Sequence, residues 1–199
     1  YPEWLSISAV RDAGGEVTHF VGVFTDIKEL VGTQEKLRYM AHYDALTGLP
    51  NRHLFDDRYG QAMSRALRFR QQMALLVIGL DPGLASKPGV VKLAAKELAG
   101  HVRESDTLAR ISGAEFALML DHVDGAPEVS VIADKLLASF KLPLSAGADK
   151  VLVSACIGIS LFPIDGHEVD GLIRDARVAK AEAELQGRNT YSFFSSQMN

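Results

Sequence analysis

The sequence has little of what a disulfide-bonded, membrane-spanning or nucleic-acid-binding protein needs. Its single cysteine cannot form an internal disulfide. Cys156 lies in an apolar run, where a small buried side chain is the expected role and a reactive thiol the alternative. No apolar stretch approaches the roughly 20 residues of a membrane-spanning helix. The net charge of −4 argues against nucleic-acid binding, because neutralising phosphates requires an excess of cations.

Metal-site spacing and targeting signals are also absent. The six histidines have no ligand-like spacing, so a surface or core position is expected for each: His19, His42, His53, His101, His122 and His167. There is no signal peptide, and the sequence opens without Met in the middle of a strand pattern. We therefore expect a fragment of a larger protein in a reducing, cytoplasmic setting.

The remaining composition, 47% apolar and 23% charged, is that of a globular protein long enough for one domain and an appendage. Trp4–Val10 and Thr18–Thr25 alternate apolar and polar residues around a Gly-Gly turn, which predicts a β-hairpin over residues 1–26. A lone hairpin is marginal in water, so further strands are expected beside it. The pattern resembles the last two strands of a PAS sensor domain.

A helix is predicted over residues 27–43, with Asp26 as its cap and Glu29 completing a capping-box spacing. Its apolar positions follow the narrow seam of a coiled coil: Ile27, Leu30, Gln34, Leu37 and Ala41. Two interpretations stay open. The helix either pairs with a second copy, as a signalling linker and homodimer contact, or packs on its own domain.

From Asp44 to Asn199 the pattern is mixed α/β. A β-α-β-β-α-β order is predicted, typical of a ferredoxin-like or palm core, with extra elements at both ends. The predicted elements are a helix over 54–69, a strand at Met73–Leu80, a helix over 91–102, a hairpin of Thr107–Ile111 and Glu115–Leu120, a helix over 129–140, a strand at Val151–Leu161, a helix over 172–183 and a strand at Tyr191–Phe194.

Two segments identify a family: Asp44–Arg52, DALTGLPNR, and Arg110–Phe116, RISGAEF. Together they resemble the signature of GGDEF domains, the diguanylate cyclases that condense two GTP into cyclic di-GMP. The resemblance covers residues 44–199 and implies the ferredoxin-like fold. In that family the second segment is the active-site turn, with two glycines followed by two acids.

The chemistry of this turn is incomplete. Joining two nucleotides requires carboxylates for a divalent cation and a group that assists removal of the hydroxyl proton. This chain offers Ser112, Gly113, Ala114 and Glu115, and an alanine can neither bind a metal nor accept a proton.

The resemblance implies further losses. Gly79 stands where the family has a metal-binding aspartate, and Asp81 matches the next aspartate of the pattern. The loop after Asp81 is short and lacks the family's guanine-reading residues. Glu184 stands where the family has a phosphate-binding lysine. Lys180 lies one helical turn earlier and is expected to point to a different place along the helix from that lysine.

Arg103 and Asp106 have the spacing of the family's Arg-x-x-Asp product-binding site, and their side chains suit a guanine edge or a phosphate. A helix-end ion pair is the alternative. Thr47, Asn51 and Arg52 are interpreted as structural, with Asn51 capping the following helix.

The sequence thus predicts a catalytically inactive regulatory module that relays a sensor signal to a following domain. The C-terminal segment resembles the junction into an EAL phosphodiesterase domain. A weakly active cyclase using Glu115 and Asp81 is one alternative, and a cyclic di-GMP receptor is another. Mg²⁺ is expected only with residual cyclase activity, and GTP or cyclic di-GMP are the candidate effectors.

Overall fold

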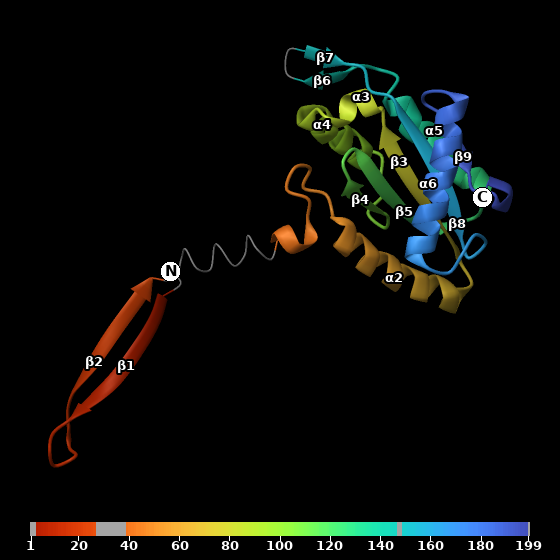
Figure 1. Cartoon of the computed structure of the whole chain (residues 1–199). Coiled ribbons are helices and arrows are strands. Elements are labelled where there is room, and N and C mark those ends of the chain that lie inside the picture. The colour runs from red at the N-terminus through yellow and green to blue at the C-terminus, as the bar shows by residue number, and fades with distance from the viewer. Residues whose placement is uncertain (1–2, 27–38, 147–148, 199) are drawn as a thin grey trace. The chain divides into compact units, whose positions relative to one another are not determined.

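The computed structural model describes residues 3–26, 39–146 and 149–198. The chain divides into two compact units, Tyr1–Ala41 and His42–Asn199, and each is described by itself (Figure 1).

The first unit contains the predicted hairpin. Strands β1 (Glu3–Arg11) and β2 (Val17–Asp26) pair antiparallel, and the Asp12 carboxylate closes the turn by accepting from the backbone N–H groups of Gly14 and Glu16. Residues 27–38 of the predicted linker helix lie outside the described residues; residues 39–42 are helical, and Tyr43 instead forms a bridge with Pro50. Asp26, expected as its cap, is the last residue of β2.

The second unit has the predicted order of major elements. They are α2 (Arg52–Phe69), β3 (Gln72–Leu80), α3 (Pro82–Ala85), α4 (Pro88–Ala99), β4 (Thr107–Ser112), β5 (Glu115–Val123), α5 (Ala126–Ser139), β6 (Leu144–Ala146), β7 (Asp149–Val151), β8 (Ala155–Phe162), α6 (Val169–Gln186), β9 (Tyr191–Phe193) and a 3-10 turn, η1 (Ser196–Met198).

The central sheet has the strand order β4-β5-β3-β8-β9, antiparallel except where β9 joins β8 in parallel. This arrangement confirms the ferredoxin-like core. Strand β3 is central, and its alternate residues face opposite layers because side chains alternate along a strand. Met73, Leu75 and Val77 pack with α2 and α6, while Leu76 and Ile78 pack with α4 and α5 (Figure 1).

Helix α6 lies unusually close to β8. A Cβ added to Gly158 would lie 1.9 Å from the carbonyl oxygen of Ala176 and 2.2 Å from the backbone nitrogen of Lys180. Only glycine allows this approach, which brings α6 down onto the end of the sheet that carries the β4–β5 turn.

Several boundaries differ from prediction by a few residues, and two of these differences have a clear reason. The strand predicted from Val151 begins at Ala155, and Val151 belongs instead to the short β6–β7 hairpin. Strands of three residues are too short to show a periodicity. The helix predicted to reach residue 102 ends at Ala99, where Gly100 caps it.

Candidate functional site

The turn between β4 and β5 is anchored to the segment that precedes α2. Gly113 adopts a positive φ of 38°, and the Arg110 side chain spans the turn: its Nε donates to the carbonyl oxygen of Gly113 at 2.8 Å and its Nη1 to Asp44 Oδ2 at 2.8 Å. Burial alone would raise the pKa of Asp44. The hydrogen bonds from Thr47 and the guanidinium of Arg110 outweigh it and hold that pKa below its ordinary value of 3.8.

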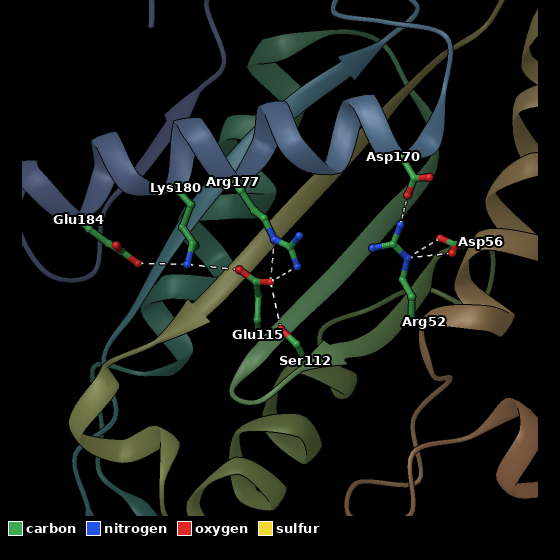
Figure 2. A network of polar contacts seen from close by, with 8 residues as sticks. All are labelled: Arg52, Asp56, Ser112, Glu115, Asp170, Arg177, Lys180 and Glu184. Atoms are coloured by element: carbon green, nitrogen blue, oxygen red, sulfur yellow. Dashed lines mark hydrogen bonds and ion pairs between the residues drawn. The ribbon is translucent and has the colours of Figure 1, made fainter. Parts of the chain in front are cut away.

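Glu115, the acid remaining in the turn, is held by two cations of α6. Arg177 donates to its Oε2 from Nη2 at 2.6 Å and from Nε at 2.9 Å, and Lys180 Nζ lies 3.3 Å from its Oε1. Figure 2 shows both side chains reaching down from the helix to the carboxylate. Burial would raise the pKa of Glu115, but Arg177 first and Lys180 second hold it below its usual 4.5.

Lys180 also occupies the space above Gly79. Gly79 pairs with Glu115 across the sheet, and a Cβ at residue 79 would lie 2.9 Å from Lys180 Nζ and 3.0 Å from its Cδ. One turn along α6, Glu184 Oε1 lies 3.3 Å from the same ammonium. The expectation that Lys180 points away from the turn is therefore wrong, because the approach of α6 at Gly158 brings this helix face over Gly79.

Ala114 and Asp81 are both in contact with neighbouring parts of the fold. Ala114 is almost buried on the side of the sheet that packs on α4 and α5, and its carbonyl oxygen accepts from Leu80 N at 3.1 Å. Asp81 caps α3 by accepting from Gly83 N at 2.9 Å, and Arg188 lies 3.2 Å from its other oxygen. The structure thus places Asp81 beside Arg188 and not beside Glu115.

A cavity of about 240 Å³ lies next to this group, lined by Gly79, Asp81, Cys156, Glu184 and Arg188 among others. Cys156 is buried, as predicted, and its Sγ donates to the carbonyl oxygen of Gly187 at 3.2 Å. The wall of the cavity therefore carries two carboxylates and one guanidinium, with Arg188 already paired to Asp81.

Arg103 and Asp106 line a different cavity of about 250 Å³, together with Lys135 and apolar residues of β5 and α5. Arg103 is 67% exposed and its Nη1 lies 3.6 Å from Glu128 Oε1. Asp106 accepts weakly from Asp121 N at 3.4 Å, and its partial burial raises its pKa. The two residues are thus brought to one cavity, with the guanidinium held only loosely.

Asn51 of the first motif caps the following helix as predicted, and Thr47 and Arg52 make contacts within the domain. Asn51 Oδ1 accepts from Leu54 N at 3.0 Å and caps α2, and Thr47 Oγ1 donates to Asp44 Oδ1 at 2.7 Å. Arg52 contacts Asp56 on its own helix and Asp170 on α6 (Figure 2).

Sequence reasoning missed the contact of Arg177 and Lys180 with the turn. Their spacing of three residues, continued by Glu184 four residues later, places all three on one face of α6. That spacing was the available signal, but the partner of this face depends on how the helix crosses the sheet.

Among residues 3–26, 39–146 and 149–198, no group of three or more His, Cys, Asp or Glu side chains is arranged to hold a metal ion. Within the same residues, no helix is long and apolar enough to cross a membrane.

The chain matches the sequence profile described as diguanylate cyclase, GGDEF domain, over residues 41–82 and 87–190. It is 35% identical over 178 residues to the bifunctional diguanylate cyclase/cyclic di-GMP phosphodiesterase MucR of Pseudomonas aeruginosa, covering 85% of this chain and 26% of that protein. Identity to the diguanylate cyclase TpbB of the same species is 34% over 163 residues, covering 77% of this chain and 38% of TpbB. The chain thus spans well under half the length of either relative.

The solved GGDEF domain of TpbB superposes with a TM-score of 0.72 at 34% identity, over 79% of this chain and 96% of that one. An EAL/GGDEF domain protein of M. capsulatus gives a TM-score of 0.62 at 32% identity, over 73% and 99% of the two chains. The profile match leaves out residues 83–86, most of which belong to α3. With the ferredoxin-like core, the Asp44–Arg52 motif and this profile match all in agreement, the chain belongs to the GGDEF family of diguanylate cyclase domains.

Proposed function

We propose that this GGDEF domain is a catalytically inactive regulatory module of cyclic di-GMP signalling. The observation that carries the proposal is the state of Glu115. Of the acids that the reaction would use in this turn it alone remains, and both of its oxygens face cations of the protein itself.

The reaction requires a divalent cation to neutralise triphosphate charge. Position 79 offers no carboxylate, position 114 carries an apolar methyl group, and Asp81 is engaged by Arg188 and Gly83. Glu184, an acid at the position of a phosphate-binding lysine, would repel the triphosphate. Metal binding and phosphate binding are therefore both unsupported.

The contacts of Asp44, Arg110 and Glu115 form a continuous series of ion pairs and hydrogen bonds through the domain, which supports a relay role. Asp44 binds Arg110, Arg110 holds the turn at Gly113, and Glu115 in that turn binds α6. Arg52 adds a second tie between α2 and α6. The segment entering the domain is thus linked by ionic contacts to the helix that leads to its C-terminal end.

For the longer protein we propose a PAS sensor domain that ends in the hairpin, a linker helix over residues 27–43 that pairs two copies, and a following EAL phosphodiesterase domain, all in the cytoplasm. The names of two relatives support the phosphodiesterase part of this proposal. MucR is described as a bifunctional cyclase and phosphodiesterase, and NbdA of the same species, 28% identical over 180 residues, as a cyclic di-GMP phosphodiesterase.

The test is incubation of the protein with GTP and Mg²⁺ and quantification of cyclic di-GMP by mass spectrometry, with the full-length diguanylate cyclase TpbB as positive control. No product is expected from this chain. Product formation would establish the alternative, a weakly active cyclase.

A second candidate function is binding of cyclic di-GMP at Arg103 and Asp106. It is favoured by the 250 Å³ cavity that both residues line and by the loose, exposed contact of Arg103, which leaves the guanidinium able to turn toward a ligand. Calorimetry with cyclic di-GMP should show binding that Arg103→Ala abolishes and that Arg58→Ala, at an exposed arginine outside that cavity, leaves intact. Absence of binding to the unmodified protein removes this candidate.

A further inference from the structure

We propose that Lys180 is a built-in counter-ion of the vestigial site: its ammonium fills the space above Gly79, neutralises Glu115 and holds the β4–β5 turn to α6 without any bound divalent cation. This inference goes beyond the relay function, because it concerns what holds the turn to α6 and not what the domain signals.

The space argument starts from the strand. Residues 73, 75 and 77 of β3 face α2 and α6, so a side chain at position 79 would point the same way. The missing Cβ of Gly79 leaves that space open, and Lys180 fills it, with its Nζ 2.9 Å from where the Cβ would be. Because the α6 backbone is fixed against β8 at Gly158, the lysine cannot withdraw by a shift of the helix.

The charge argument concerns two side chains that are mostly removed from water. The side chain of Lys180 is 18% exposed and that of Glu115 15%. A buried charge without a partner is costly, so their pairing stabilises both. Glu184 supplies a second carboxylate to Lys180 and Arg177 a second cation to Glu115, which makes the four-residue group electrically neutral.

A divalent cation has no place in this arrangement. Mg²⁺ binds carboxylate oxygens at about 2.0–2.1 Å, and the Oε1 atom of Glu115 already has an ammonium 3.3 Å away while Oε2 is held by Arg177. Entry of the metal would bring like charges together and would require both cations to leave.

Gly79 and Lys180 therefore form a matched pair, and substitutions at the two positions should not be additive. Gly79→Ala is expected to push the ammonium away from Glu115 and lower the melting temperature by about 2–4 °C. In a Lys180→Ala background, which removes every atom of Lys180 near the added Cβ, the same substitution should have no cost or a small benefit, because alanine is otherwise better tolerated than glycine within a strand.

The experiment measures thermal unfolding of the unmodified protein, Gly79→Ala, Lys180→Ala and the double variant, each in magnesium chloride and in EDTA. Lys92→Ala, at an exposed lysine on α4, is the matched control. Gly79→Asp combined with Lys180→Ala places a carboxylate directly opposite Glu115 and removes both the ammonium and the chain that fills that space. Mg²⁺ should raise the melting temperature of that variant and leave the unmodified protein unchanged.

Two results would overturn the proposal. One is a Mg²⁺-dependent rise in the melting temperature of the unmodified protein that Glu115→Gln abolishes. The other is an equal effect of Gly79→Ala with and without Lys180. The comparison of Gly79→Ala with and without Lys180 does not use the variant that carries Asp at position 79. It therefore tests the proposal even if that variant fails to fold.

Discussion

The carboxylate of Asp44 and the guanidinium of Arg110 lie 2.8 Å apart although 66 residues separate them in the chain. The pair joins the two sequence motifs that identified the family, one before α2 and the other at the β4–β5 turn. Both side chains are about four-fifths buried, so the contact is shielded from solvent on most sides.

Loss of this pair should destabilise the domain measurably. Arg110→Ala leaves the Asp44 carboxylate without its cation and frees the turn at Gly113, so the free energy of unfolding should fall by about 2 kcal/mol. Arg65→Ala removes a more exposed pair with Asp121 and should cost at most about 1 kcal/mol. Urea unfolding of the two variants gives the comparison, and equal losses would contradict a special role for Arg110.

The Asp44 contact also predicts a pH dependence. The pKa of Asp44 in the folded protein lies below 3.8, so the unfolded chain binds the proton more tightly. Its contribution to stability is therefore fully present above about pH 4 and is lost as the pH falls through the folded-state pKa. The stability difference between the unmodified protein and Asp44→Asn should shrink as urea unfolding is moved from neutral pH to below pH 3.8. A constant difference would show that the carboxylate charge is not what stabilises the turn.

The close approach of α6 to β8 predicts a severe effect at one glycine. In Gly158→Ala the new methyl group would lie 1.9 Å from the Ala176 carbonyl oxygen. Since neither backbone can give way easily, a loss of about 4 kcal/mol or more, or failure to fold, is expected. Gly60→Ala is the matched control, because nothing lies within 4 Å of its added Cβ and alanine favours a helix by about 1 kcal/mol. Circular dichroism melts distinguish the two.

Helix capping by Asn51 gives a smaller and more local prediction. Its Oδ1 satisfies the N–H of Leu54 at the start of α2, and Asn51→Ala should lower stability by about 1 kcal/mol. Asn51→Ser, which keeps an accepting oxygen, should retain most of the stability. Chemical unfolding measures both, and equal losses would indicate that another contact of Asn51 is responsible.

The sequence predicted the features that depend on local pattern. The order of the major strands and helices, the buried position of Cys156 and the cap at Asn51 follow from periodicity and turn chemistry, and the structure confirms them. The short β6–β7 hairpin was missed because three-residue strands have no readable period.

The position of Lys180 could not be predicted for a different reason. Its distance to Glu115 depends on how closely α6 crosses β8, which is set by Gly158 and the helix backbone opposite it. Alignment on a motif gives the order of residues along a helix but not the depth at which the helix lies on a sheet.

The central claim is that Glu115 is occupied by the protein's own cations in a site that no longer catalyses. Cyclic di-GMP formation from GTP and Mg²⁺, measured in parallel on the unmodified protein and on Glu115→Gln, tests it most directly. We predict no product from either protein. Product from the unmodified protein that disappears in Glu115→Gln would contradict the claim, because it would show that this carboxylate still serves the reaction.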